Sequence, residues 1–235
     1  MTFSAAFNVL QNDDLLFCIF EWIGEHESLP ARLVSHQWNR VYRRHHEVSK
    51  LVASNVSLFC GSQNMLEWAI GLGMPVSRVC GYVASHGNVP LLQWLRSQDP
   101  PCPWDVYACI YAAQKGHLGV IQWLRAQDPP CPWDENAFKY AARNGHLEVL
   151  QWLRSQDPPC PWDENACKFA AMNGHLQVLQ WLRSQDPPCP WDEYACKYAA
   201  QNGHLVVIQW LRSQDPPCPW NQWSLIVAAQ NGHLE

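Results

Sequence analysis

Histidine and cysteine recur together along this chain, and both residue types can bind metal ions or take part in catalysis. Five histidines each follow a cysteine by fifteen positions, at His117, His146, His175, His204 and His233. The short spacings of zinc sites, such as C-x2-C or H-x3–5-H, are absent around these pairs. A catalytic pair needs no copy in every unit, whereas a residue that holds each unit together does. We therefore expect no metal, no cofactor and no catalytic residue, and we predict that the chain is not an enzyme.

The elements that carry these residues are copies of one segment of about 29 residues. Near-identical copies begin at Pro103, Pro132, Pro161 and Pro190, and a last copy begins at Pro219 and stops at Glu235. Self-similarity at a fixed period predicts a stacked repeat array. Because the last copy is cut within the repeat, we expect low stability and rapid amide exchange over residues 219–235.

Each copy predicts two short helices and an extended loop. In the copy that begins at Pro161, Asp163 is suited to cap a first helix over about residues 164–172. Asn173-Gly174 ends that helix, since Gly is the favoured residue after a helix C-terminus. A second helix begins at His175-Leu176 and presents an apolar ridge. The prolines of residues 186–190 then exclude helix. Such a unit cannot bury its apolar faces alone, so neighbouring units must stack.

The chain contains 11 cysteines, many of them at equivalent positions of the repeat. Equivalent positions in stacked helices lie roughly 8–10 Å apart, whereas a disulfide needs Cα atoms within about 7 Å. We therefore predict reduced, buried cysteines that pack as small hydrophobic residues, which fits a reducing compartment.

Two rows of tryptophan follow the same period. The first row lies in the loops, at Trp104, Trp133, Trp162, Trp191 and Trp220. The second lies in the second helices, at Trp94, Trp123, Trp152, Trp181 and Trp210. With its flanking prolines, the loop row could form an exposed strip for Pro-rich or sugar ligands. Since burial of Trp is strongly stabilising, we favour core packing for both rows.

The positions that differ between copies are the better indication of a binding site. Three such positions lie in the first helices. They hold Tyr107, Asn136, Asn165, Tyr194 and Trp223; Ile110, Lys139, Lys168, Lys197 and Ile226; and Gln114, Arg143, Met172, Gln201 and Gln230. Tyr, Trp and Arg are typical interface anchors. We expect a target-binding face that includes Tyr107, Asn136, Lys139, Arg143, Asn165, Lys168, Tyr194 and Lys197; tolerated drift on a solvated face is the alternative.

The repeat resembles the ankyrin repeat. The resemblance rests on Ala-Ala-x-Asn-Gly-His-Leu-x-Val-Leu-x-x-Leu, as in residues 170–182. It implies that each His closes the turn between its two helices by hydrogen bonding. The unit is shorter than the 33 residues of the family, it lacks the Thr-Pro-Leu-His opening, and Gln-Asp-Pro-Pro-Cys-Pro-Trp replaces the β-finger residues. We therefore expect paired helices without regular β-fingers.

The N-terminal stretch, residues 1–50, predicts a small helical domain. Leu15, Leu16, Ile19, Phe20 and Ile23 form one apolar stripe at helical spacing. The stretch resembles an F-box, with matches at Leu10, Asp13 or Asp14, Leu15, Ile19, Phe20, Leu29, Arg32, Val34, Ser35 and Trp38. The resemblance implies that Leu10, Leu15, Ile19, Phe20, Leu29, Val34 and Trp38 bind the Skp linker subunit of a cullin ubiquitin ligase. Gln11 stands where the family usually has Pro. Alternatively, these helices only cap the array.

The predicted fold is therefore all-α: an F-box-like domain in residues 1–50, a degenerate repeat and junction in residues 51–76, and an ankyrin-like helical repeat solenoid in residues 77–235. The chain as a whole resembles F-box and ankyrin-repeat proteins of large DNA viruses. That resemblance implies a substrate-recognition adaptor of a ubiquitin ligase. The alternative is a protein–protein interaction scaffold.

Composition narrows the expected partners. The net charge of −5 argues against non-specific binding of nucleic acid. No apolar run is long enough to span a membrane, and the N-terminus lacks the pattern of a secretory signal. We expect an intracellular, cytoplasmic monomer that binds the linker subunit and one further target protein.

Overall fold

The computed structural model describes residues 63–71 and 79–233. The chain divides into two compact units, Met1–Pro75 and Val76–Glu235. In the first unit, α6 (Gln63–Gly71) buries Leu66 completely. The F-box-like stretch and all seven residues predicted to bind the linker subunit lie outside the described residues, so those assignments remain predictions.

The second unit is a row of paired helices. The first helix of each repeat is here called helix one. These helices are α7 (Val79–Ser85), α9 (Val106–Lys115), α11 (Glu135–Arg143), α13 (Glu164–Met172), α15 (Glu193–Gln201) and α17 (Gln222–Gln230). The second helices, here called helix two, are α8 (Val89–Arg96), α10 (Leu118–Arg125), α12 (Leu147–Ser155), α14 (Leu176–Arg183) and α16 (Leu205–Ser213). The described residues contain no strand, so the predicted all-α solenoid without regular β-fingers is confirmed.

Local capping sets the bounds of helix one. In α13, the Asp163 carboxylate accepts a hydrogen bond from the Asn165 N–H at 3.1 Å, which confirms its predicted role as N-cap. At the other end, Gly174 adopts a left-handed conformation with φ of +77°. The His175 N–H donates to the Ala170 carbonyl at 2.9 Å, as in a Schellman motif. The predicted span of residues 164–172 agrees with the observed helix.

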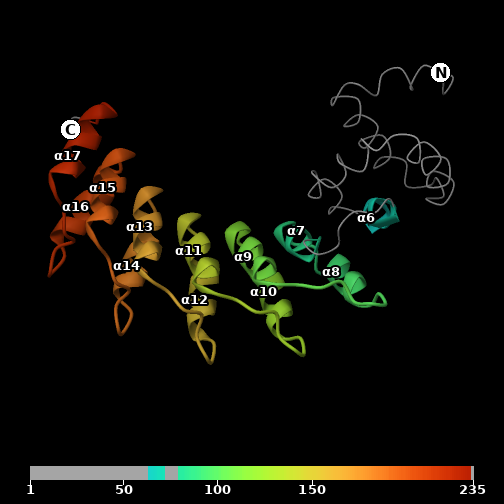
Figure 1. The fold of residues 1–235 in the computed structure, drawn as a ribbon. Helices are drawn as coiled ribbons and strands as arrows, with labels where there is room; N and C mark the ends of the chain where they lie inside the picture. Colours follow the sequence, from blue (N-terminus) through green and yellow to red (C-terminus); the bar gives the residue numbers. More distant parts are fainter. Residues whose placement is uncertain (1–62, 72–78, 234–235) are drawn as a thin grey trace, which may run out of the picture. The chain divides into compact units, whose positions relative to one another are not determined.

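The array is held together chiefly by its first helices. Each helix one packs against the next along one side of the row, and the loops project beyond the helix-two side (Figure 1). The facing surfaces are small: Ala166, Cys167, Ala170 and Ala171 in α13 are all buried. Small side chains let neighbouring helix axes approach closely. Val178, Leu179 and Leu182 of α14 complete the core from the second row.

The loops are fixed by hydrogen bonds to the helix that precedes them. After α14, the Cys189 N–H donates to the Leu182 carbonyl at 3.0 Å, and the Gln185 side chain donates to the Trp181 carbonyl at 3.0 Å. Each loop contains a cis Asp–Pro peptide, such as Asp186–Pro187. The hydrogen bond from the loop cysteine N–H to helix two recurs after α8, α10, α12, α14 and α16.

Candidate recognition surface

Helix one carries a column of aromatic side chains along the row. The column consists of Tyr82, Tyr111, Tyr140, Phe169 and Tyr198, all half-buried. Tyr82 and Tyr111 have ring centroids 5.8 Å apart, so the contact runs from one repeat to the next. This column was not predicted from the positions that vary between copies, because an aromatic residue recurs here in five successive copies.

The predicted target-binding residues flank this column. Tyr107 and Tyr194 expose 49% and 41% of their surface. The Tyr107 ring contacts Tyr111 at 5.7 Å, and the Tyr194 ring stacks on Tyr198 at 6.0 Å. The structure therefore brings both exposed tyrosines together with the aromatic column of their own helices. Rings held in this way lose little conformational entropy when a partner covers them.

Cationic side chains lie over the same rings. Lys168 Nζ is 5.1 Å from the Phe169 ring and 5.9 Å from the Tyr194 ring, so it joins two repeats. Lys197 contacts the rings of Tyr194 and Tyr198, and Lys139 contacts that of Tyr140. The exposed Arg143 lies 5.7 Å from Phe169 in the next repeat. The predicted lysines and Arg143 thus extend the aromatic column into one mixed aromatic and cationic face. In the preceding repeat, Ile110 occupies the position of Lys139 and is buried.

The two predicted asparagines have local partners. Asn136 Nδ2 donates to the Asp134 carboxylate at 3.0 Å, and Asn165 Nδ2 donates to Asp163 at 2.6 Å. The Lys139 ammonium donates to the Asn136 side-chain oxygen. These asparagines reinforce the N-caps of α11 and α13 and border the aromatic column without extending it.

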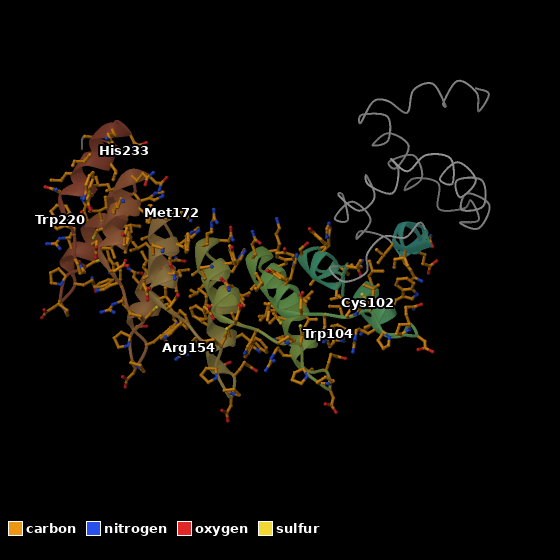
Figure 2. The ribbon with its side chains drawn as sticks, in the orientation of Figure 1. Cys102, Trp104, Arg154, Met172, Trp220 and His233 are labelled. Atoms are coloured by element: carbon orange, nitrogen blue, oxygen red, sulfur yellow. The ribbon has the colours of Figure 1, made fainter. Side chains whose placement is uncertain are left out.

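The recurring histidines bridge neighbouring repeats. The His175 ring donates through Nε2 to the Arg143 carbonyl at 3.0 Å. The same hydrogen bond to a backbone carbonyl joins His117 to Ser85, His146 to Gln114 and His204 to Met172. The side-chain bond therefore reaches back into the preceding repeat. The predicted closure of the turn by each His is made by its backbone N–H, as in the bond from His175 to the Ala170 carbonyl. Met172 and His233 lie on the helix-one side of the row (Figure 2).

The histidine row has a measurable electrostatic consequence. Burial lowers the pKa of His175, the hydrogen bond from its ring to the Arg143 carbonyl raises it, and the neighbouring His146 and His204 lower it further. The net direction is downward, so the neutral ring is the preferred form. In the first described repeat, Asn88 replaces the His and caps α8 by accepting from the Leu91 N–H at 3.0 Å.

The loop tryptophans and an arginine from the previous helix two form a second periodic feature. The Arg154 guanidinium lies 4.0 Å from the Trp162 ring centroid, and Trp162 meets Trp181 edge to face at 6.5 Å. Arg183 repeats the arrangement on Trp191 and also donates to the Cys189 carbonyl at 2.7 Å. Trp104 and Arg154, which belong to two such pairs of Trp and Arg, are labelled in Figure 2.

Neither tryptophan row lies fully in the core. The rings in the inner repeats are half-buried, and Trp220 exposes 46% of its surface. Core packing was therefore the wrong prediction for both rows. Each loop ring is covered by an arginine on its face. Four of the loop rings, Trp104, Trp133, Trp162 and Trp191, also meet a second Trp at an edge. An uninterrupted aromatic strip is not formed, since an arginine lies over each loop ring.

No metal centre is found in the part of the chain that the structure describes: no three His, Cys, Asp or Glu side chains lie close enough together to hold an ion. The nine described cysteines are buried, and none forms a disulfide. Across residues 63–71 and 79–233, no helix is long and apolar enough to cross a membrane.

Comparison with known families assigns the repeat. Residues 106–154 and 167–212 match the family model described as ankyrin repeats in many copies. Ankyrin repeats are thus detected in these two segments. The resemblance inferred from the Asn-Gly-His-Leu pattern is confirmed there, although Pro-rich loops stand where β-fingers are usual. Ankyrin repeats support a role in protein–protein interaction. No curated protein matches the chain.

Proposed function

We propose that this protein is a substrate-recognition adaptor of a cullin-type ubiquitin ligase. Its ankyrin repeats bind a target protein, and its N-terminal F-box-like stretch docks on the Skp linker subunit. Such an adaptor acts by raising the effective concentration of its target near the ligase. It needs no active site of its own, and its place of action is the cytoplasm.

The observation that carries target binding is the face on helix one. Tyr107 and Tyr194 are exposed, yet each ring is held by a neighbouring aromatic side chain. Lys168 and Arg143 add cationic groups across the boundaries between repeats. Tyr and Arg are the residue types most enriched among interface anchors. We propose that this face binds the target protein.

Docking on the linker subunit rests on the F-box-like pattern of residues 10–38. Its strongest segment is Ala-Arg-Leu-Val-Ser-His-Gln-Trp, which ends at Trp38. The test is a binding titration of the purified full chain against the Skp linker subunit. We expect binding that is lost when Leu15, Ile19 and Trp38 are replaced together by Ala.

The matched control for that titration is Tyr107→Ala combined with Tyr194→Ala. This variant removes two exposed rings of the repeats and leaves the N-terminal stretch unchanged, so its affinity for the linker subunit should equal that of the parent. Circular dichroism of each variant verifies that the repeats are folded. Absence of binding by the well-folded parent chain would overturn the adaptor proposal.

A second measurement tests the proposed target-binding face. Proteins that co-purify with the parent chain are compared with those that co-purify with the combined Tyr107→Ala, Arg143→Ala and Tyr194→Ala variant. We expect the target to be lost and the linker subunit to be retained. Retention of every identified partner would show that helix one does not present the binding face.

The alternative function is an interaction scaffold without a ligase. The observation that favours it is Gln11, which stands where the F-box family usually has Pro. Under this alternative, the target is still captured by the repeats, but the linker subunit does not bind. Replacement of Gln11 by Pro separates the two: a gain in linker affinity indicates a weakened F-box, whereas no binding by either form indicates a scaffold.

A further inference from the structure

Four repeats place two cysteines side by side. One lies in helix one and the other in the loop that follows helix two, so the two are 22 positions apart. The pairs are Cys80 with Cys102, Cys109 with Cys131, Cys167 with Cys189, and Cys196 with Cys218. The Sγ atoms of Cys80 and Cys102 are 3.2 Å apart. In two further pairs the helix-one thiol lies next to the backbone carbonyl of its loop cysteine, at 4.0 Å for Cys167 and Cys189 and at 3.9 Å for Cys196 and Cys218. The spacing of roughly 8–10 Å expected between equivalent positions applies to neighbouring repeats, whereas these pairs lie within one repeat.

We propose that each of these pairs is an oxidisable dithiol, which forms a disulfide between helix one and the loop of its own repeat on reaction with a small-molecule disulfide. In the pair of Cys80 and Cys102 the two sulfur atoms are already in contact, so the bond needs a movement of little more than 1 Å to reach the usual S–S length of about 2.05 Å. The other three pairs occupy the same two positions of the repeat. Because the partners come from the two ends of the repeat, the bond closes the unit on itself.

The reaction is a two-step thiol–disulfide exchange. A thiolate of the pair attacks one sulfur of the small disulfide, which forms a mixed disulfide and releases one small thiolate. The second cysteine loses its proton and attacks the protein sulfur of the mixed disulfide, which releases the second small thiolate. The protein dithiol is oxidised by two electrons, the small disulfide is reduced by two, and both released thiolates take up protons.

The pair of Cys80 and Cys102 should react first. Cys102 is 5% exposed, whereas the other loop cysteines are completely buried. The thiol of Cys80 donates a hydrogen bond to Cys102, which lowers the pKa of Cys102 and raises that of Cys80. The group that attacks is therefore the loop cysteine. In the inner repeats the loop must open before the reagent can reach the sulfur, so oxidation is slower there.

The third repeat provides an internal control. Phe138 occupies the helix-one position, and its ring meets Trp162 edge to face at 5.3 Å. Cys160 keeps the same loop position, and its thiol donates to the Asp134 carbonyl at 3.4 Å. Burial raises the pKa of Cys160 to about 12, which suppresses its thiolate. Cys160 should therefore remain reduced while the four pairs oxidise.

The test uses the full chain with Cys18 and Cys60 replaced by Ser, so that the remaining cysteines are those of the repeats. The folded protein is incubated with oxidised glutathione, the remaining thiols are alkylated, and the disulfides are mapped by peptide mass spectrometry. We expect four links, each between cysteines 22 positions apart, with Cys160 alkylated and the link of Cys80 and Cys102 formed first. Incubation of the protein in urea provides the comparison, since an unfolded chain links cysteines without this spacing.

Two outcomes would overturn the proposal. One is a set of links in the folded protein that matches the set formed in urea. The other is persistent mixed disulfides with glutathione, or no reaction at all, under conditions that fully oxidise the unfolded chain. Cys109→Ser should remove only the link to Cys131 and leave the other three.

A gain of function completes the test. Phe138→Cys restores the helix-one cysteine opposite Cys160, so a fifth link should form in this variant. The readout is again the mapped disulfide, and circular dichroism measures whether the helices are retained after loss of the Phe138 ring. A folded variant in which Cys160 stays reduced would show that these positions do not bring their sulfur atoms together.

Discussion

Replacement of Gly145 by Ala tests the histidine bridge between repeats. Gly145 has a φ of +78°, and an added Cβ would lie 2.8 Å from Nδ1 of His175 in the next repeat. The left-handed conformation costs an Ala residue about 1–2 kcal/mol, offset by roughly 0.4–1 kcal/mol from reduced freedom of the unfolded chain. Displacement of the imidazole also breaks its hydrogen bond to the Arg143 carbonyl, a loss of about 1 kcal/mol. The total expected destabilisation is about 2 kcal/mol.

A double-mutant cycle separates the two contributions. In a His175→Ala background the bridge is already absent, so Gly145→Ala should cost only the backbone strain, about 1 kcal/mol. The coupling free energy between the two sites is then about 1 kcal/mol, measured from urea unfolding of the four proteins by circular dichroism. Gly119→Ala is the control, because that exposed helical glycine has no atom within 4 Å of an added Cβ; this change should be neutral or stabilising. Equal costs of Gly145→Ala in both backgrounds would refute the bridge.

Three further predictions concern pH, the loop clamp and helix α17. Because the pKa of His175 is lowered below 6.5 in the folded state, the unfolded chain binds more protons as pH falls through that value; stability should therefore decrease from pH 7.5 to 5.5, and His175→Gln should reduce this slope in urea unfolding. Arg183→Met removes both the contact with Trp191 and the hydrogen bond to the loop, and should cost about 1–2 kcal/mol by thermal unfolding; an unchanged midpoint would contradict the clamp. Amides of α17 should exchange faster than those of α13, since Leu225 exposes 62% of its surface; equal protection would contradict this.

The sequence predicted those parts of the fold that depend on local chemistry. The helix over residues 164–172, its cap at Asp163 and its end at Gly174 all follow from interactions within a few positions. The 29-residue period was likewise sufficient to predict stacking. These features need no knowledge of which side chains meet across a repeat boundary.

The contacts between repeats could not be read from the sequence in the same way. His175 bonds to a carbonyl 32 positions earlier, and Arg154 lies over a ring in the following unit. Both distances depend on the angle and rise between stacked units, which no local pattern specifies. The aromatic column that includes Tyr140 had a signal in the sequence, namely its recurrence, but a search restricted to varying positions passed over it.

The candidate binding face was predicted in part. Tyr107 and Tyr194 lie exposed on helix one as expected, because the period places equivalent positions on one side of the row. The roles of Asn136 and Asn165 differ, since their amides bond to the capping aspartates. Competition between a local cap and an open surface is decided by side-chain geometry, which the sequence alone does not give.

The histidine bridge also bears on how a gene for such an array can change in length. Every bridge joins equivalent positions, so removal of residues 132–160 would place His175 opposite Gly116 and the carbonyl of Gln114, the same chemical surroundings that it loses. Near-identical copies recombine readily. Loss of one whole repeat by recombination would then give a shorter chain in which the two newly adjacent repeats already have matching contact surfaces. Length can thus change in steps of one repeat while the histidine contacts between the remaining repeats stay the same.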